Sequence, residues 1–102
     1  MQGDVHANPG PSAGYAPYLL DVQADLLAEL DTRVVVPLIR AEAFGRRISR
    51  LHPGFTVADQ AVVMATHLIA AVRRSTLGPA LASLQPQHDE IVAAIDVLLS
   101  GI

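Results

Sequence analysis

The sequence predicts a mainly β domain that ends in one α-helix, and two observations lead to this prediction. Short apolar runs of strand length, bounded by polar or turn-forming residues, lie at Tyr18–Val22, Thr32–Leu38, Phe55–Ala58 and Ala61–Thr66. From Gln87 to Ile102, apolar residues instead recur at helical spacing. The chain has 102 residues, of which 51% are apolar, so we expect one domain over residues 1–102 with a single small core.

Composition and charge narrow the classes of protein. The net charge of -3 argues against a general nucleic-acid binder, which would carry a basic excess. Disulfides and thiolate chemistry are excluded because the chain has no cysteine. We expect a cytoplasmic protein without a membrane partner, since neither a signal peptide nor a membrane-spanning apolar stretch is recognisable. All seven basic residues are Arg, for which genomic base composition is the simplest explanation.

The first third of the chain mixes clear and ambiguous signals. Residues 1–17 favour loops and turns, with a short strand around Gln2–His6 as an option. Tyr18–Val22 is a compact apolar run that predicts a strand. From Asp21 to Leu30, apolar residues fall at helical spacing, so the local pattern alone favours a helix there.

A second strand is predicted over Thr32–Leu38. Its three consecutive Val residues are stiff at χ1 and favour the pleated conformation. Because Pro37 has no backbone donor, the strand should end there or place that position where the donor is unpaired.

The middle of the chain contains a basic cluster and a predicted hairpin. Arg46, Arg47 and Arg50 most simply form a solvated loop, and contact with an acidic partner segment is the alternative. Phe55–Ala58 and Ala61–Thr66 read as the two strands of a hairpin that turns at the polar pair between them.

The C-terminal helix carries apolar residues on more than one side. Asp89 and Glu90 lie near its start, where the helix dipole favours negative charge, and Gly101 is placed to end it. Val92 and Leu99 lie on a second side, which needs a partner, either another copy of the chain or a different protein. One apolar face at i, i+3, i+4 and i+7 spacing can pack on the sheet: Ile91, Ala94, Ile95 and Leu98.

No constellation for catalysis is visible. The sequence has no glycine-rich phosphate loop and no nucleophile elbow. Asp21 and Asp25 could share a helix face, but on a strand-and-turn interpretation they would not form a pair. We therefore expect a binding protein, not an enzyme, with no cofactor and no metal. The four histidines follow no metal-binding pattern and are expected to be satisfied surface or edge residues: His6, His52, His67 and His88.

Two blocks resemble the CcdB-type toxins, the toxin halves of type II toxin–antitoxin modules on plasmids and chromosomes. The family signature begins with VDVQSD and two aliphatic residues, and the similar segment here is Leu20–Leu27 (LDVQADLL). The signature continues with R-aliphatic-V-aliphatic-P-L, and the similar segment here is Thr32–Leu38 (TRVVVPL). The terminal helix closes on Gly101 and Ile102, as the family closes on Gly-Ile. The resemblance covers residues 15–102 with a small length difference in the middle.

The resemblance implies a fold and a function. The fold is an SH3-like small β-barrel, an antiparallel sheet plus a smaller sheet, with one C-terminal α-helix, and Asp21–Leu27 becomes strand and turn. The function is that of a homodimer that binds the DNA gyrase A subunit and traps the gyrase–DNA cleavage complex. A cognate CcdA-type antitoxin neutralises such toxins through a largely disordered segment. Such a toxin contacts DNA only indirectly, as part of the toxin–antitoxin complex that regulates transcription. Members of the family are not enzymes.

Family contact positions carry over residue by residue to a gyrase-binding set. It comprises Leu26, Leu27, Asp96, Leu99, Ser100, Gly101 and Ile102. An apolar knob with a free carboxylate at its tip suits a groove that contains an Arg.

Three departures from the family pattern bear on activity. Ser100 replaces the Trp of the best-known plasmid toxin, and Ser is not a typical anchor residue. Gly3 replaces an aromatic residue and is expected to weaken packing of the first strand, and Arg73 and Arg74 add charge to a normally apolar piece. The alternative function is a CcdB-fold protein that has lost gyrase poisoning and acts as an antitoxin-binding transcriptional co-repressor or on another target.

Overall fold

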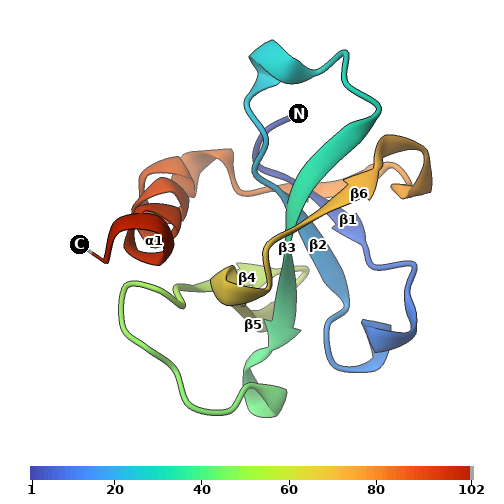
Figure 1. Ribbon diagram of the computed structural model, residues 1–102. Helices are drawn as coiled ribbons and strands as arrows, with labels where there is room; N and C mark the ends of the chain where they lie inside the picture. Colours follow the sequence, from blue (N-terminus) through green and yellow to red (C-terminus); the bar gives the residue numbers. More distant parts are fainter. Residues whose placement is uncertain (102) are drawn as a thin grey trace.

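The computed structural model describes residues 1–101, which form a seven-stranded antiparallel sheet and one α-helix (Figure 1). The strand order is β4-β5-β3-β2-β1-β7, and β6 pairs with β3 outside this path. This mainly β fold with a C-terminal helix confirms the predicted SH3-like small barrel. The elements are β1 (Asp4–Ala7), β2 (Tyr18–Asp21), β3 (Thr32–Arg40), β4 (Gly54–Val57), β5 (Gln60–Met64), β6 (Ala70–Arg73), β7 (Ala80–Ser83) and α1 (His88–Ser100).

The long strand β3 is shared by the two parts of the sheet. One of its edges pairs with β2, while the other pairs first with β6 and then with β5. Pro37 lies in the gap between these two partners, where its carbonyl accepts a hydrogen bond from the Ala65 amide at 2.9 Å. The missing donor of Pro37 faces the same gap, because N–H and C=O of one strand residue point to the same edge. The strand does not end at Pro37, and the alternative prediction, an unpaired donor position, is confirmed.

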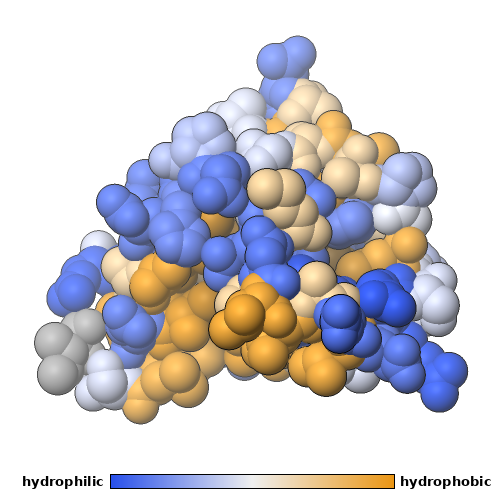
Figure 2. Space-filling model, turned by 90° about the horizontal axis from the view of Figure 1, so that it is seen from above, coloured by the Kyte–Doolittle hydropathy of each residue, from blue (hydrophilic) through white to orange (hydrophobic). Residues whose placement is uncertain are grey.

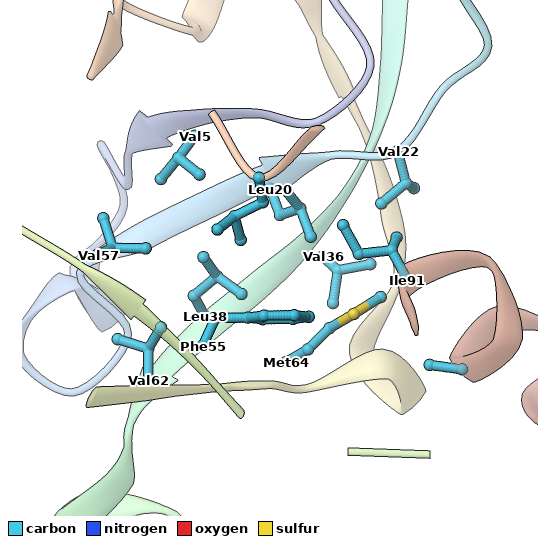
Figure 3. Close-up of a cluster of buried hydrophobic side chains, with 12 residues drawn as sticks. Val5, Leu20, Val22, Val36, Leu38, Phe55, Val57, Val62, Met64 and Ile91 are labelled. Carbon is cyan, nitrogen blue, oxygen red and sulfur yellow. The ribbon is translucent and has the colours of Figure 1, made fainter. Parts of the chain in front are cut away.

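One apolar core lies between the curled sheet and α1 (Figure 3). Leu20 from β2, Leu38 from β3 and Met64 from β5 are fully buried at its centre. Ile91 and Ala94 bring α1 onto them. Burying one such aliphatic side chain stabilises a fold by about 1.5–3 kcal/mol. The helix is therefore held to the sheet mainly by this single apolar stripe.

The ends and faces of α1 match the predicted pattern. Asp89 and Glu90 lie in the first turn, and Gly101 ends the helix in the left-handed conformation with φ of 74°. Ile91 and Ala94 are buried and the rest of that face is half-buried, which confirms the sheet-facing side. The second apolar side, which includes Leu99, remains exposed.

The helix predicted from periodicity over Asp21–Leu30 is not formed, so that prediction is wrong. After β2, a single 3-10 turn, η2 (Asp25–Leu27), precedes β3. The competing signal is a long-range network, because Gln23 Oε1 accepts the Val34 amide at 3.0 Å and holds the chain extended beside β3. Asp21 and Asp25 accordingly do not form a carboxylate pair.

The predicted hairpin is present, but its turn lies one residue earlier. Val57 pairs with Gln60, so Ala58 and Asp59 are the turn, not Asp59 and Gln60. Both turn residues have positive φ, 50° for Ala58 and 64° for Asp59, as the right-handed twist of the strands requires in a two-residue hairpin loop. Asp tolerates this conformation, whereas Ala is an unusual choice for it.

Gly3 lies immediately before β1, not inside the first strand where we expected it. It is buried with φ of 91°, a region that favours glycine. A Cβ added here would lie 3.1 Å from the backbone nitrogen of Gln85. A larger residue would therefore strain the backbone and displace the segment that leads into α1.

Candidate functional site

The first two predicted contact residues lie on a turn between β2 and β3. Leu26 is 92% exposed and Leu27 is 47% exposed, although both are large and apolar. They are presented by η2, and the Arg74 Nη1 atom donates to the Ala28 carbonyl at 2.8 Å just after it. We name residues 24–28 the Leu26 turn. Exposed leucines at a tied-down turn are suited to contact with another protein.

A buried ion pair supports the Leu26 turn. Arg33 grips Asp21 with two hydrogen bonds of 2.9 and 3.0 Å, and both side chains are almost fully buried. Gln23 continues the network, because its Nε2 donates to the Leu27 carbonyl at 3.0 Å. Such a pair is well compensated only while both partners are present. The VDVQSD-like block thus supplies residues that position the turn, in addition to the two leucines that it exposes.

The other predicted contact residues lie at the end of α1. Asp96, Leu99 and Ser100 are exposed, and Leu99 reaches 77%. Ser100 Oγ donates to the Asp96 carbonyl at 2.6 Å, and the Gly101 amide donates to the Val97 carbonyl at 2.9 Å. We name Asp96–Gly101 the α1 tip. Ile102, the last member of the predicted set, lies outside the described residues.

The structure places the predicted residues in two separate groups. In Figure 1 the α1 tip lies at the left, while the Leu26 turn lies at the upper end of the molecule. Figure 2, which looks down on that upper end, shows apolar side chains gathered along its lower edge and interrupted by hydrophilic ones. The gyrase-binding role of these residues stays a prediction.

Sequence reasoning missed a histidine–aromatic cluster. His52 is buried, and its ring centroid lies 4.9 Å from those of both Phe44 and His67. The Ile48 amide donates to His52 Nδ1 at 2.9 Å, so the ring proton sits on Nε2, which is 2.9 Å from His67 Nδ1. Burial, followed by the nearby His67 and Arg47, lowers the pKa of His52 below its ordinary value of 6.5.

No sequence signal identifies this pair, since 15 positions separate the two histidines. Only the return of the chain through the β4–β5 hairpin places them side by side. His52 is thus a buried structural residue, not the surface or edge residue that we expected.

A pocket of about 500 Å³ opens beside this cluster, between the loop after β3 and the N-terminal half of α1. Charged, polar and apolar surface line it together: Arg47, Ser49, Arg50, His52, Pro53, Glu90 and Ala93. Within residues 1–101, no group of three or more His, Asp or Glu side chains is placed to hold a metal ion. In the same part of the chain, no helix is long and apolar enough to cross a membrane.

These features define a small SH3-like barrel closed by one C-terminal helix with an exposed tip. The family model of the CcdB protein matches residues 2–101, so the chain belongs to the CcdB family and the resemblance seen in the sequence is confirmed. The fold is also similar to a solved endoribonuclease in complex with its cognate antitoxin from mycobacterial species. That match has a TM-score of 0.74 and 19% identity, and it covers 97% of this chain and 93% of the other.

Proposed function

We propose that this protein is the toxin of a type II toxin–antitoxin module and poisons DNA gyrase. In this proposal it binds the A subunit and traps the gyrase–DNA cleavage complex, without acting as an enzyme. The observation that carries the proposal is the α1 tip, where an apolar side chain, Leu99, stands exposed on a capped helix in a member of the CcdB family. A rigid apolar knob is a suitable anchor for a groove on a partner protein.

A homodimer and a CcdA-type antitoxin complete the proposal. Val92 on α1 is 38% exposed, and Leu68 is 47% exposed in η4 (Thr66–Leu68), the 3-10 turn that packs against α1. A second copy of the chain would cover such residues, which supports a dimer. The antitoxin complex of the structurally similar endoribonuclease supports an antitoxin partner. Light scattering coupled to size-exclusion chromatography measures the mass, and a monomer at micromolar concentration would contradict the dimer.

One observation favours the alternative of a CcdB-fold protein without gyrase poisoning. The Ser100 hydroxyl bonds back to its own helix and offers no anchor that could fill a pocket. Such a protein would keep antitoxin binding and act as a transcriptional co-repressor. Pull-down with the gyrase A subunit separates the two functions, since the alternative predicts no capture.

Growth after induction tests the proposal. The intact chain should arrest growth in a host with normal gyrase, spare a gyrase-resistant host, and lose its effect when Gly101 and Ile102 are deleted. Co-expression of the antitoxin should restore growth. Continued growth with folded protein present would contradict the proposal. RNA cleavage by the purified chain would instead indicate the activity of the mycobacterial protein that shares its fold.

A further inference from the structure

A second surface is set apart by its charge. Between Glu42 and Asp59 the chain contains no acidic residue, although the whole protein has a net charge of -3. We name residues 44–53 the arginine loop. Its three Arg side chains are exposed, and among residues 1–101 none of them lies within ion-pair distance of a carboxylate: Arg46, Arg47 and Arg50.

The arginine loop is fixed in place despite having almost no regular structure. Arg47 Nη2 donates to the His52 carbonyl at 3.0 Å, and the His52 amide donates to the Ile48 carbonyl at 2.9 Å. Thr66 Oγ1 donates to the Leu51 carbonyl at 2.5 Å and ties the loop to η4. A loop that is ordered before a partner arrives loses less entropy on binding.

The pocket beside the loop combines charge with apolar surface. Arg50 and Ser49 line one wall, and Glu90 and Ala93 of α1 line the other. Figure 1 shows this loop, in green, running beneath α1. Ile48, in the middle of the loop, is 57% exposed and adds an apolar contact next to the guanidinium groups. An occupant therefore needs carboxylates for the arginines and an apolar side chain for Ile48.

We propose that the arginine loop and its pocket bind an acidic peptide segment that carries apolar residues, and that this segment belongs to the antitoxin. The inference rests on the proposed toxin–antitoxin function, and it assigns a docking surface distinct from the α1 tip. Arg forms bidentate hydrogen bonds with carboxylates, and this geometry suits an acidic segment that becomes ordered on binding. A nucleic acid fits less well, because Arg73 and Arg74 do not extend the patch: they line a different pocket with Asp31.

Titration calorimetry with the purified cognate antitoxin tests the assignment. Arg50→Glu should raise Kd about tenfold and flatten its dependence on salt, because one favourable charge becomes repulsive. Glu90→Gln should leave Kd unchanged or lower it, since it removes a like charge opposite the segment. Arg73→Glu, the same reversal at an exposed arginine outside this surface, is the matched control and should change Kd less than about twofold.

Separate readouts distinguish this inference from the proposed function. Arg50→Glu should still arrest growth, and the antitoxin should no longer rescue it fully. An unchanged Kd for Arg50→Glu with a normal melting curve would overturn the docking assignment. Binding of a DNA or RNA oligonucleotide that is lost in Arg50→Glu, with no effect on the antitoxin, would also overturn it. If cells that express the unmodified chain keep growing while the chain still binds the antitoxin, only the proposed gyrase function is overturned.

Discussion

The α1 tip and the arginine loop are both exposed, but they are held in different ways. At the tip, Ser100 bonds to Asp96 and Gly101 to Val97, so each contact lies within one helical turn. The loop instead depends on residues far along the chain, since His52 contacts His67 and Leu51 contacts Thr66. A self-contained helix end can change its surface without affecting the fold, whereas the loop's anchors also affect stability.

The largest expected effect is the loss of gyrase binding when the α1 tip is changed. Leu99→Asp puts a charge on the α1 tip where we propose an apolar contact, and loss of such an anchor costs about 2–4 kcal/mol of binding. Gyrase binding should weaken at least about thirtyfold by this measure and growth arrest should disappear. The free energy of unfolding should change by less than about 0.5 kcal/mol, because the side chain is exposed.

Leu81→Asp is the matched control, because Leu81 is an exposed leucine of β7, 57% accessible, outside the predicted contact set. Urea unfolding and pull-down of the gyrase A subunit on both variants measure the two effects. Equal loss of gyrase binding in the two variants would show that the α1 tip has no special role.

The next effect concerns the Leu26 turn, which also depends on long-range contacts. Asp21→Asn leaves Arg33 buried without its counter-charge, so the free energy of unfolding should fall by about 3 kcal/mol. Asp25→Asn provides the control, since Asp25 is exposed and accepts one hydrogen bond, from the Gln2 amide. Its cost should stay below about 1 kcal/mol. Equal urea midpoints for the two variants would contradict a role for the buried pair.

A smaller effect is expected at the arginine loop. His52→Ala removes the ring that accepts the Ile48 amide and contacts His67, so it should lower the free energy of unfolding by about 2 kcal/mol. Protease nicking should rise within residues 44–53 and not at the α1 tip. Uniform protection of the loop in the variant would mean that the cluster does not hold it.

The same histidine makes stability depend on pH. The pKa of His52 is lower in the fold than its ordinary value of 6.5. As the pH falls, the unfolded chain therefore takes up a proton at this histidine before the folded chain does. The contribution of His52 to the free energy of unfolding is complete above pH 6.5. It is lost as the pH falls from 6.5 through the pKa of His52 in the folded state. His52→Gln should show a shallower loss than the unmodified chain when urea unfolding is measured on both sides of 6.5. Identical pH slopes would contradict the assignment.

Much of the fold follows from local pattern, and the exceptions have physical causes. The α1 helix, its sheet-facing side and its Gly101 end are readable from spacing, because helices are periodic over neighbouring residues. The segment after Asp21 is not, since the Gln23 bond to Val34 overrides its helical periodicity. The same limit applies to the site: the family motif identifies the exposed leucines, but the His52–His67 pair exists only after folding.

The smallest effect tests the hairpin that brings those histidines together. Ala58 adopts φ of 50° in the β4–β5 turn, a conformation that costs a non-glycine residue about 1 kcal/mol. Ala58→Gly should therefore raise the free energy of unfolding by about 0.5 kcal/mol, after the entropy that glycine gains in the unfolded chain. A lower melting temperature would indicate that the turn has a different conformation.

Trapping of the gyrase–DNA cleavage complex by the purified protein tests the central claim most directly. Supercoiled DNA, gyrase and ATP are incubated with the unmodified chain or with Leu99→Asp, and linear DNA is measured after denaturation. The account predicts that linear DNA accumulates with the unmodified chain and stays at background with Leu99→Asp. Background levels with the folded, unmodified chain would contradict it.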